Sequence, residues 1–180
     1  DALARLQLWM SWADQNGTWE SLDQATHVIQ LPPLSQDAVW QDFQQRSPEY
    51  LKINPRGRVP ALVADGKVLV ENVAILSFLG GGYASKGLWP ERTWDQAQAL
   101  SLMAWLADTV HPAFAHLYRP ERYVQGEAHV GAVKEGGRKS FGECLAEIDR
   151  ILAGRKWAAG GRFSVVDAYL LVFYRWGNRN

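Results

Sequence analysis

The feature that most constrains this chain's fold is a change in its hydrophobic pattern near residue 83. Before this point, short strand-like segments alternate with turn residues. From Thr93 onward, apolar residues recur with the 3.6-residue period of amphipathic helices. We therefore predict an α/β domain over residues 1–83, a linker over 84–92 and an all-helical domain over 93–180. We expect the helical domain to be incomplete at its end.

The α/β part has the predicted element order β-α-β-α-β-β-α. Strand-like segments lie at residues 6–11 and 27–31. The clearest signal is Asp65-Gly66, which joins strand-like runs at 59–64 and 67–70 and favours a two-residue type I′ hairpin turn. This order is typical of a thioredoxin-like domain.

Helices are predicted on both sides of the linker. One covers residues 71–78 and is ended by three glycines at 80–82. A long helix begins at Thr93, and we expect Pro112 to kink it because proline removes a backbone donor. A later helix over 165–176 is apolar almost all round, which predicts burial at the centre of the helical domain.

Composition excludes several classes of partner. Lys plus Arg and Asp plus Glu each total 19, and no basic stripe is present, so we expect no nucleic-acid partner. No apolar run reaches the roughly 18–20 residues of a membrane span, so we expect no membrane partner. Cys144 is the only cysteine, which excludes an intrachain disulfide and fits a reducing, cytoplasmic location. We expect it to be a buried structural thiol.

Two motifs carry the candidate chemistry. In Asn-Pro-Arg-Gly-Arg-Val-Pro-Ala-Leu at residues 54–62, a cis Val59-Pro60 bond would leave the Val59 N–H and C=O free to pair with an extended peptide. Glu71 and Asn72 lie at a predicted helix N-terminus, which favours a carboxylate, while Glu71 can bind an ammonium. Taken singly, the motifs also fit an ordinary loop-to-strand proline and simple helix capping. We expect the two to lie side by side, as one cradle.

The two motifs, in this order and spacing, resemble the glutathione site of the glutathione S-transferase superfamily, in particular of bacterial beta-like or nu-like members. The resemblance implies a thioredoxin-like glutathione-binding domain followed by an all-α domain. It implies that Val59 aligns the cysteinyl part of glutathione, with Arg58 and Pro60 beside it. Glu71 and Asn72 would hold the γ-glutamyl end.

Ser164 and Asp167 form a predicted capping box at the start of the last helix. The serine caps the helix, and the aspartate three residues later reaches back. We interpret this pair as structural. The surrounding Phe-Ser-Val-Val-Asp-Ala at residues 163–168 is similar to the box found in the helical domain of glutathione transferases.

The resemblance also suggests how a second-substrate pocket is lined. Residues 105–114 are similar to a helix of beta-like transferases that carries a histidine into the cleft, which makes His111 a candidate donor to the thiolate or to the second substrate. Trp12, Trp105 and Phe114 are expected beside it. A lone histidine on a helix is more often a packing or surface residue, and this alternative stays open for His111.

The thiol of glutathione must become a thiolate, although an unperturbed thiol has a pKa of about 8.5. In the family, a donor in the loop after the first strand stabilises the thiolate, and beta-like members use a cysteine there. This chain has no cysteine in that loop, which argues against mixed-disulfide chemistry. Ser11 and Asn16 are the candidate catalytic donors, and their alternative role is turn formation.

The sequence therefore predicts a homodimeric glutathione transferase that conjugates the glutathione thiolate to a small apolar electrophile. Glutathione would be a co-substrate, with no separate cofactor and no metal. Two alternatives stay open: a glutathione-dependent disulfide reductase or lyase, and a non-catalytic binding module of the same fold.

Overall fold

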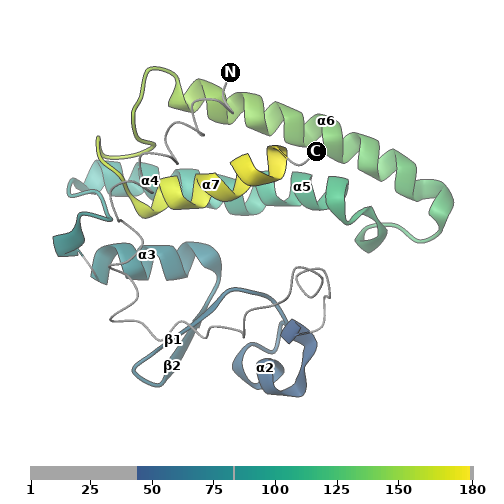
Figure 1. The fold of residues 1–180 in the computed structure, drawn as a ribbon, viewed down its shortest axis with the longest axis horizontal. Coiled ribbons are helices and arrows are strands. Elements are labelled where there is room, and N and C mark those ends of the chain that lie inside the picture. The colour runs from purple at the N-terminus through teal and green to yellow at the C-terminus, as the bar shows by residue number, and fades with distance from the viewer. Residues whose placement is uncertain (1–43, 83, 179–180) are drawn as a thin grey trace.

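The computed structural model describes residues 44–82 and 84–178. The part of the chain that it describes contains a two-stranded sheet and a set of helices that pack around one hydrophobic core (Figure 1). Some predictions concern residues outside these ranges. They are the strands at 6–11 and 27–31 and the roles of Ser11, Trp12 and Asn16.

Strands β1 (Ala61–Ala64) and β2 (Lys67–Val70) form the predicted hairpin. They are antiparallel, with Ala61 opposite Val70 at the open end. The turn residues Asp65 and Gly66 have φ angles of 49° and 72°, the left-handed values that a type I′ turn requires. The hairpin prediction is confirmed, although the first strand begins two residues later than expected.

Helices α2 (Pro48–Ile53) and α3 (Asn72–Gly82) flank the hairpin in the sequence, and a 3-10 turn at Gln44–Arg46 precedes α2. The prediction that three glycines end α3 is wrong, because all three belong to the helix. Gly80 shows why glycine is used inside it. A Cβ atom there would lie 2.9 Å from the indole ring of Trp89, so only glycine permits this close approach.

Helix α4 (Thr93–Trp105), a π-helical turn η5 (Leu106–Val110) and helix α5 (His111–Tyr118) follow one another without a break. The kink expected at Pro112 takes the form of this wider turn. The His111 N–H donates to the Leu106 carbonyl, five residues back, just before the proline that cannot donate. Local departures of this kind are frequent at functional sites.

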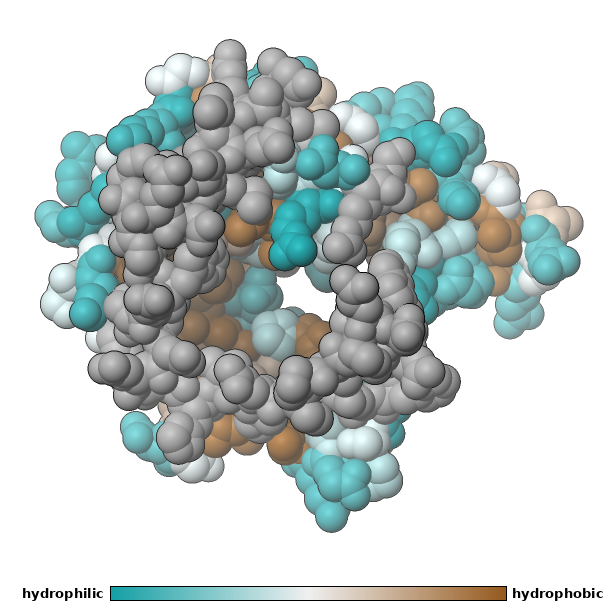
Figure 2. All heavy atoms as spheres, in the orientation of Figure 1, coloured by the Kyte–Doolittle hydropathy of each residue, from teal (hydrophilic) through white to brown (hydrophobic). Residues whose placement is uncertain are grey.

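Helix α6 (Glu127–Leu152) follows a 3-10 turn at Pro120–Arg122, and α7 (Val165–Gly177) ends the described chain. In Figure 1, α6 runs along α5, and α7 lies in the layer between α6 and α3. The predicted burial of the last helix is confirmed by its buried residues, which are Val165, Val166, Asp167, Tyr169, Leu170, Phe173 and Tyr174. The outer side of α6 is mostly hydrophilic, as the upper right of Figure 2 shows.

The predicted capping box is present at the start of α7. The Ser164 N–H donates to Asp167 Oδ2 at 2.7 Å, and the Ser164 hydroxyl donates to the same oxygen at 2.9 Å. Asp167 Oδ1 also accepts from the Ala158 N–H at 2.8 Å. The predicted linker packs against this helix start, since the Val165 N–H donates to the Leu88 carbonyl at 3.1 Å. The division into domains stays a prediction.

None of the helices in the described ranges has the length and apolar character needed to cross a membrane. Cys144 is buried on α6, as expected. Burial raises the pKa of its thiol, and the neighbouring carboxylates of Glu143 and Glu147 raise it further. A thiol in this environment is a poor nucleophile.

Candidate functional site

The bend before β1 is held by buried polar side chains. The Tyr50 hydroxyl and the Asn54 side-chain amide both donate to the Arg58 carbonyl, at 2.6 and 2.7 Å. Asn54 is only 3% exposed, and its Oδ1 accepts from the Arg56 N–H at 3.2 Å. A turn bond from the Gly57 N–H to the Asn54 carbonyl, 2.9 Å, completes the arrangement. Residues 54–58 are therefore fixed from inside the protein.

Val59 follows this fixed segment and is open to solvent. The Val59-Pro60 peptide bond is cis, and the Val59 residue is 58% exposed. No hydrogen bond to the described residues uses its backbone N–H or carbonyl. Both groups can therefore pair with the backbone of an extended peptide, in the manner of an added strand.

Glu71 lies at the same end of the hairpin as this bend. Because Ala61 pairs with Val70, the next residues outward, Pro60 and Glu71, lie opposite each other beyond the ladder. The two motifs thus lie side by side at this end of the hairpin, an arrangement called the cradle below. That it binds a ligand stays a prediction. Glu71 precedes the first residue of α3, and its carbonyl accepts from the Ile75 N–H at 3.0 Å.

The backbone of Glu71 is strained. Its φ angle is +72°, in the left-handed region that residues with a Cβ atom rarely adopt. Such outliers cluster at ligand-binding and catalytic sites, because a purely structural position would favour glycine. The Glu71 side chain is 70% exposed and faces Arg56, with Oε1 3.4 Å from Nη1.

Asn72, the first residue of α3, connects the cradle to the helical core. Its side chain lies beside the hydroxyl of Tyr169, which is on α7 and only 6% exposed. Burial raises the pKa of Tyr169, and the hydrogen bond with Asn72 opposes that rise. The role of Asn72 toward a ligand carboxylate stays a prediction, and the backbone N–H groups of the helix start are further donors at this end of α3.

Two of the predicted second-substrate residues are brought together by a third aromatic residue, Trp176 of α7. The indole stacks on Phe114 with 4.2 Å between ring centroids, and the His111 ring meets it edge-on at 5.0 Å. Phe114 is 8% exposed, so this ring is part of the core. Trp105 is half-buried against the same core and joins no ring contact among the described residues. The roles of these residues toward a second substrate stay predictions.

His111 links the aromatic cluster to the cradle. Partial burial of the imidazole lowers its pKa, and the positive charge of Arg58 lowers the pKa further. The charge of Arg58 thus acts on His111, and Arg58 directly precedes the exposed Val59 of the bend. A histidine with a lowered pKa is neutral near pH 7 and can donate or accept a hydrogen bond.

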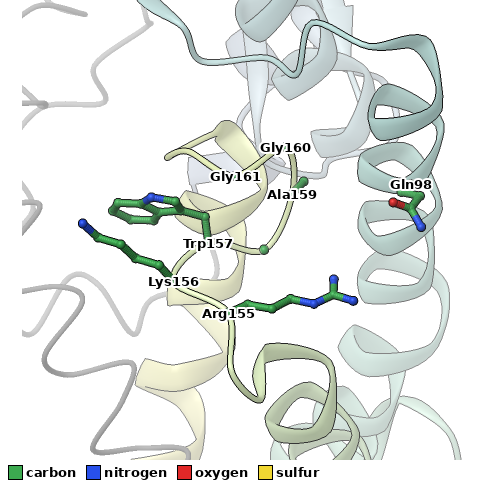
Figure 3. A pocket seen from close by; sticks show the side chains of 8 residues that line it. Gln98, Arg155, Lys156, Trp157, Ala159, Gly160 and Gly161 are labelled. Carbon is green, nitrogen blue, oxygen red and sulfur yellow. The ribbon is translucent and has the colours of Figure 1, made fainter.

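A separate cavity of about 320 Å³ lies between α4 and the connection from α6 to α7. In Figure 3, the Arg155 side chain extends toward α4, where Gln98 projects from the opposite wall, and Lys156 and Trp157 point away from it. None of the residues that line the cavity is a predicted site residue. In the described ranges, no cluster of His, Cys, Asp and Glu side chains is arranged to hold a metal ion.

Comparison with known proteins identifies the family. Residues 37–81 match the family model of the glutathione S-transferase N-terminal domain. A glutathione-S-transferase structure from Xylella fastidiosa is 30% identical, with a TM-score of 0.70, and the similarity covers 77% of this chain and 68% of that one. This chain belongs to the glutathione S-transferase superfamily. Its fold is the one predicted, a thioredoxin-like N-terminal domain followed by a helical domain.

Two further relatives are similar over most of the chain. The glutathione S-transferase GST-4.5 of Xanthomonas campestris pv. campestris is 33% identical over 135 residues, 74% of this chain and 66% of that protein. A glutathione transferase homologue from Sulfitobacter, solved with bound glutathione, is 34% identical with a TM-score of 0.68, and the similarity covers 75% of this chain and 65% of that one. The chain thus spans slightly less than two thirds of the length of these relatives.

Sequence reasoning missed several residues that build the site of this transferase-family chain. Asn54 was visible as the first residue of the motif, but its buried, bend-fixing role needs the positions of Tyr50 and Arg58. Arg56 lies in the same motif, and its proximity to Glu71 depends on the hairpin register. Tyr169 and Trp176 read only as apolar positions of a buried helix.

Proposed function

We propose that this chain binds glutathione along the cradle and conjugates its thiolate to a small apolar electrophile. The observation that carries the proposal is an exposed Val59 backbone, which makes no hydrogen bond to the described residues, beside an exposed and strained Glu71 that precedes α3. The glutathione bound to the Sulfitobacter homologue supports the same ligand here. Glutathione is then a co-substrate, and the chain uses no separate cofactor.

In this proposal the cysteinyl part of glutathione pairs with the Val59 backbone. The Glu71 carboxylate binds the γ-glutamyl ammonium, and Asn72 and the N–H groups at the start of α3 donate hydrogen bonds to the α-carboxylate. Arg58 and Pro60 line the same bend. Strand-like pairing gives affinity through the main chain, and the charged end group gives specificity.

The catalytic task is to stabilise the thiolate, and each unit by which the thiol pKa falls takes about 1.4 kcal/mol. Ser11 and Asn16 remain the proposed donors. His111, held neutral by burial and by Arg58, is a second donor that can reach a thiolate or the electrophile. Trp12, Trp105 and Phe114 are proposed to surround the apolar co-substrate.

The experiment replaces Glu71 with alanine and measures both retention on immobilised glutathione and turnover of a chlorodinitrobenzene electrophile. We expect both to be lost. Glu135→Ala is the matched control, because Glu135 is equally exposed at 72% and also pairs with an arginine, on α6. If Glu71→Ala binds and turns over like the control, the proposed site is wrong.

The same assays separate the alternatives. Turnover of a glutathione mixed disulfide without conjugation would replace the transferase with a reductase, and cleavage of a substrate by the thiolate would indicate a lyase. Glutathione binding without any turnover would indicate a binding module.

We further propose a homodimer in the cytoplasm. Trp94 and Leu100 on α4 are 69% and 42% exposed, and large exposed apolar side chains favour an interface. A single, unpaired cysteine fits a reducing compartment. Light scattering of the purified chain tests the dimer, and a Trp94→Glu variant should shift it toward monomer.

A further inference from the structure

Arg56 and Glu71 form an exposed ion pair that joins the two motifs of the cradle. Nη1 lies 3.4 Å from Oε1, and the two side chains are 66% and 70% exposed. Among the described residues, each is the other's only ion-pair partner. An ion pair so exposed contributes about 0–1 kcal/mol to stability, so it opens at little cost.

Both partners project from fixed backbone. The Arg56 N–H and the following Gly57 N–H donate to the side chain and the carbonyl of buried Asn54. On the other side, Glu71 is placed by the end of β2 and by the first turn of α3. The charges therefore return to nearly the same positions whenever a ligand leaves, and only side-chain torsions need to change.

The pair matches the end group of the proposed ligand. The γ-glutamyl end of glutathione carries an ammonium and a carboxylate on one carbon atom, whereas the cradle carries a carboxylate and a guanidinium side by side. Guanidinium binds carboxylate with two parallel hydrogen bonds, a geometry that lysine or an amide cannot supply. Asn72, the other candidate for that carboxylate, has its side chain beside Tyr169.

We propose that Arg56 is a specificity-determining residue that binds the α-carboxylate of the γ-glutamyl group while Glu71 binds its ammonium. The proposal rests on glutathione binding at the cradle. One internal ion pair is exchanged for two ion pairs with the ligand, and no covalent bond changes. A peptide that lacks either the ammonium or the α-carboxylate of the γ-glutamyl group binds only one of the two side chains. The other side chain, Arg56 or Glu71, then has neither a ligand charge nor its former ion-pair partner.

The test uses three peptides and three variants, with affinity measured by titration calorimetry. The peptides are glutathione, 4-aminobutanoyl-Cys-Gly, which lacks only the α-carboxylate, and glutaryl-Cys-Gly, which lacks only the α-amino group. The variants are Arg56→Gln, Glu71→Gln and the control Arg92→Gln. Arg92 is 75% exposed and pairs with Asp95 on α4 at 3.0 Å, so the control removes the same charge from another exposed arginine that has an ion-pair partner.

For the native chain, we expect each truncated peptide to bind about 10-fold or more weakly than glutathione. Arg56→Gln should weaken glutathione about 10-fold, yet leave the affinity for 4-aminobutanoyl-Cys-Gly equal or higher, because Glu71 loses its internal competitor. Glu71→Gln should show the mirror pattern with glutaryl-Cys-Gly. Arg92→Gln should bind all three peptides like the native chain.

Two results overturn the proposal, and they differ from failure of the glutathione site itself. If Arg56→Gln binds glutathione as well as the native chain, or weakens glutathione and 4-aminobutanoyl-Cys-Gly equally, Arg56 does not bind the α-carboxylate. If the native chain binds none of the peptides, or Glu71→Gln binds glutathione unchanged, the proposed function fails and the role of Arg56 fails with it.

Discussion

Glu71 and Asp167 both carry a carboxylate at the start of a helix, and their surroundings differ in every respect. Asp167 is 4% exposed and accepts three hydrogen bonds from Ala158 and Ser164. Glu71 is 70% exposed, has a left-handed backbone and faces an equally exposed arginine at 3.4 Å. Both carboxylate oxygens of Asp167 accept hydrogen bonds from the protein. Among the described residues, the Glu71 carboxylate contacts only the exposed Arg56 side chain.

A structural helix cap and a binding residue differ in the hydrogen-bonding capacity of the side chain and in the strain of the backbone. A cap is recognised by buried donors that it satisfies and by an unstrained backbone. A binding residue keeps unused hydrogen-bonding capacity, and the fold tolerates backbone strain to place it.

The largest effect is expected for Asp167→Ala. Its loss leaves the Ala158 N–H and both donors of Ser164 buried without their acceptor, and each such group costs about 1–3 kcal/mol. We expect the free energy of unfolding in urea to fall by about 3–5 kcal/mol. Glu135→Ala, at an exposed position, should change it by less than about 0.5 kcal/mol. A drop below about 1 kcal/mol for Asp167→Ala would remove the structural half of the comparison.

A pH dependence of the free energy of unfolding should also come from Asp167. Burial raises the pKa of Asp167 to about 6 from an ordinary value of 3.8, despite hydrogen bonds from Ala158, from Ser164 and from its own backbone that favour the carboxylate. A raised pKa means that the folded state prefers the protonated form. The contribution of Asp167 is therefore fully present below about pH 4 and is lost as pH rises through about 6.

The check is a series of urea unfolding curves between pH 4 and 7 for the native chain and for Asp167→Asn. We expect the native chain to lose stability relative to the variant across this range, by on the order of 3 kcal/mol at most. Above pH 7 the difference should be constant. Parallel curves over the whole range would show that Asp167 does not titrate there.

A smaller effect of opposite sign is expected at the other helix start. Glu71→Gly should relieve the strain of a left-handed φ angle and raise the free energy of unfolding by about 1 kcal/mol, while glutathione retention is lost. Glu71→Ala removes the same carboxylate and keeps the strain, so it should lose retention without the gain. Equal stability of the two variants, measured by thermal unfolding, would argue that residue 71 is unstrained.

The smallest effect is expected at the contact between the start of α3 and helix α7. Tyr169→Phe removes the hydroxyl beside Asn72, which helps to fix the first residue of α3, and should weaken glutathione binding about 2- to 5-fold. Tyr174→Phe is the control, because Tyr174 is also a buried residue of α7 but its hydroxyl accepts from the Asn178 side chain at 2.9 Å. The control should bind glutathione unchanged. An identical loss in both variants would indicate a general loosening of the helix.

Much of the described fold could be predicted because it depends on local chemistry. Asp65-Gly66 can form only a narrow set of turns, and the Ser164–Asp167 spacing is sufficient for a capping box. The helix starts at Thr93 and Val165 follow from hydrophobic period. The helix end was predicted at the glycines of α3 because the reason for Gly80, its close approach to Trp89, lies outside the helix.

The candidate site was predictable only in outline. The motifs located Val59 and Glu71, because each is marked by a distinctive neighbour, a proline or a helix start. The ion pair with Arg56, the contact between Asn72 and Tyr169, and the stacking of Trp176 on Phe114 join residues 15 to 97 positions apart. Side-chain proximity over such separations is set by the packed fold, and one sequence does not contain it.

The π-helical turn at Leu106–Val110 acts as an angular spacer. An α-helix advances about 100° per residue, so the residue accommodated in this wider turn changes the direction in which everything after it faces. Deleting the exposed Asp108 would restore ordinary helical winding and rotate α5 about its axis by about that amount. His111 would swing away from Arg58 and Trp176, and Phe114 would leave the core. The direction in which the His111 imidazole points thus depends on the number of residues in the π-helical turn as much as on the side chains that surround the ring.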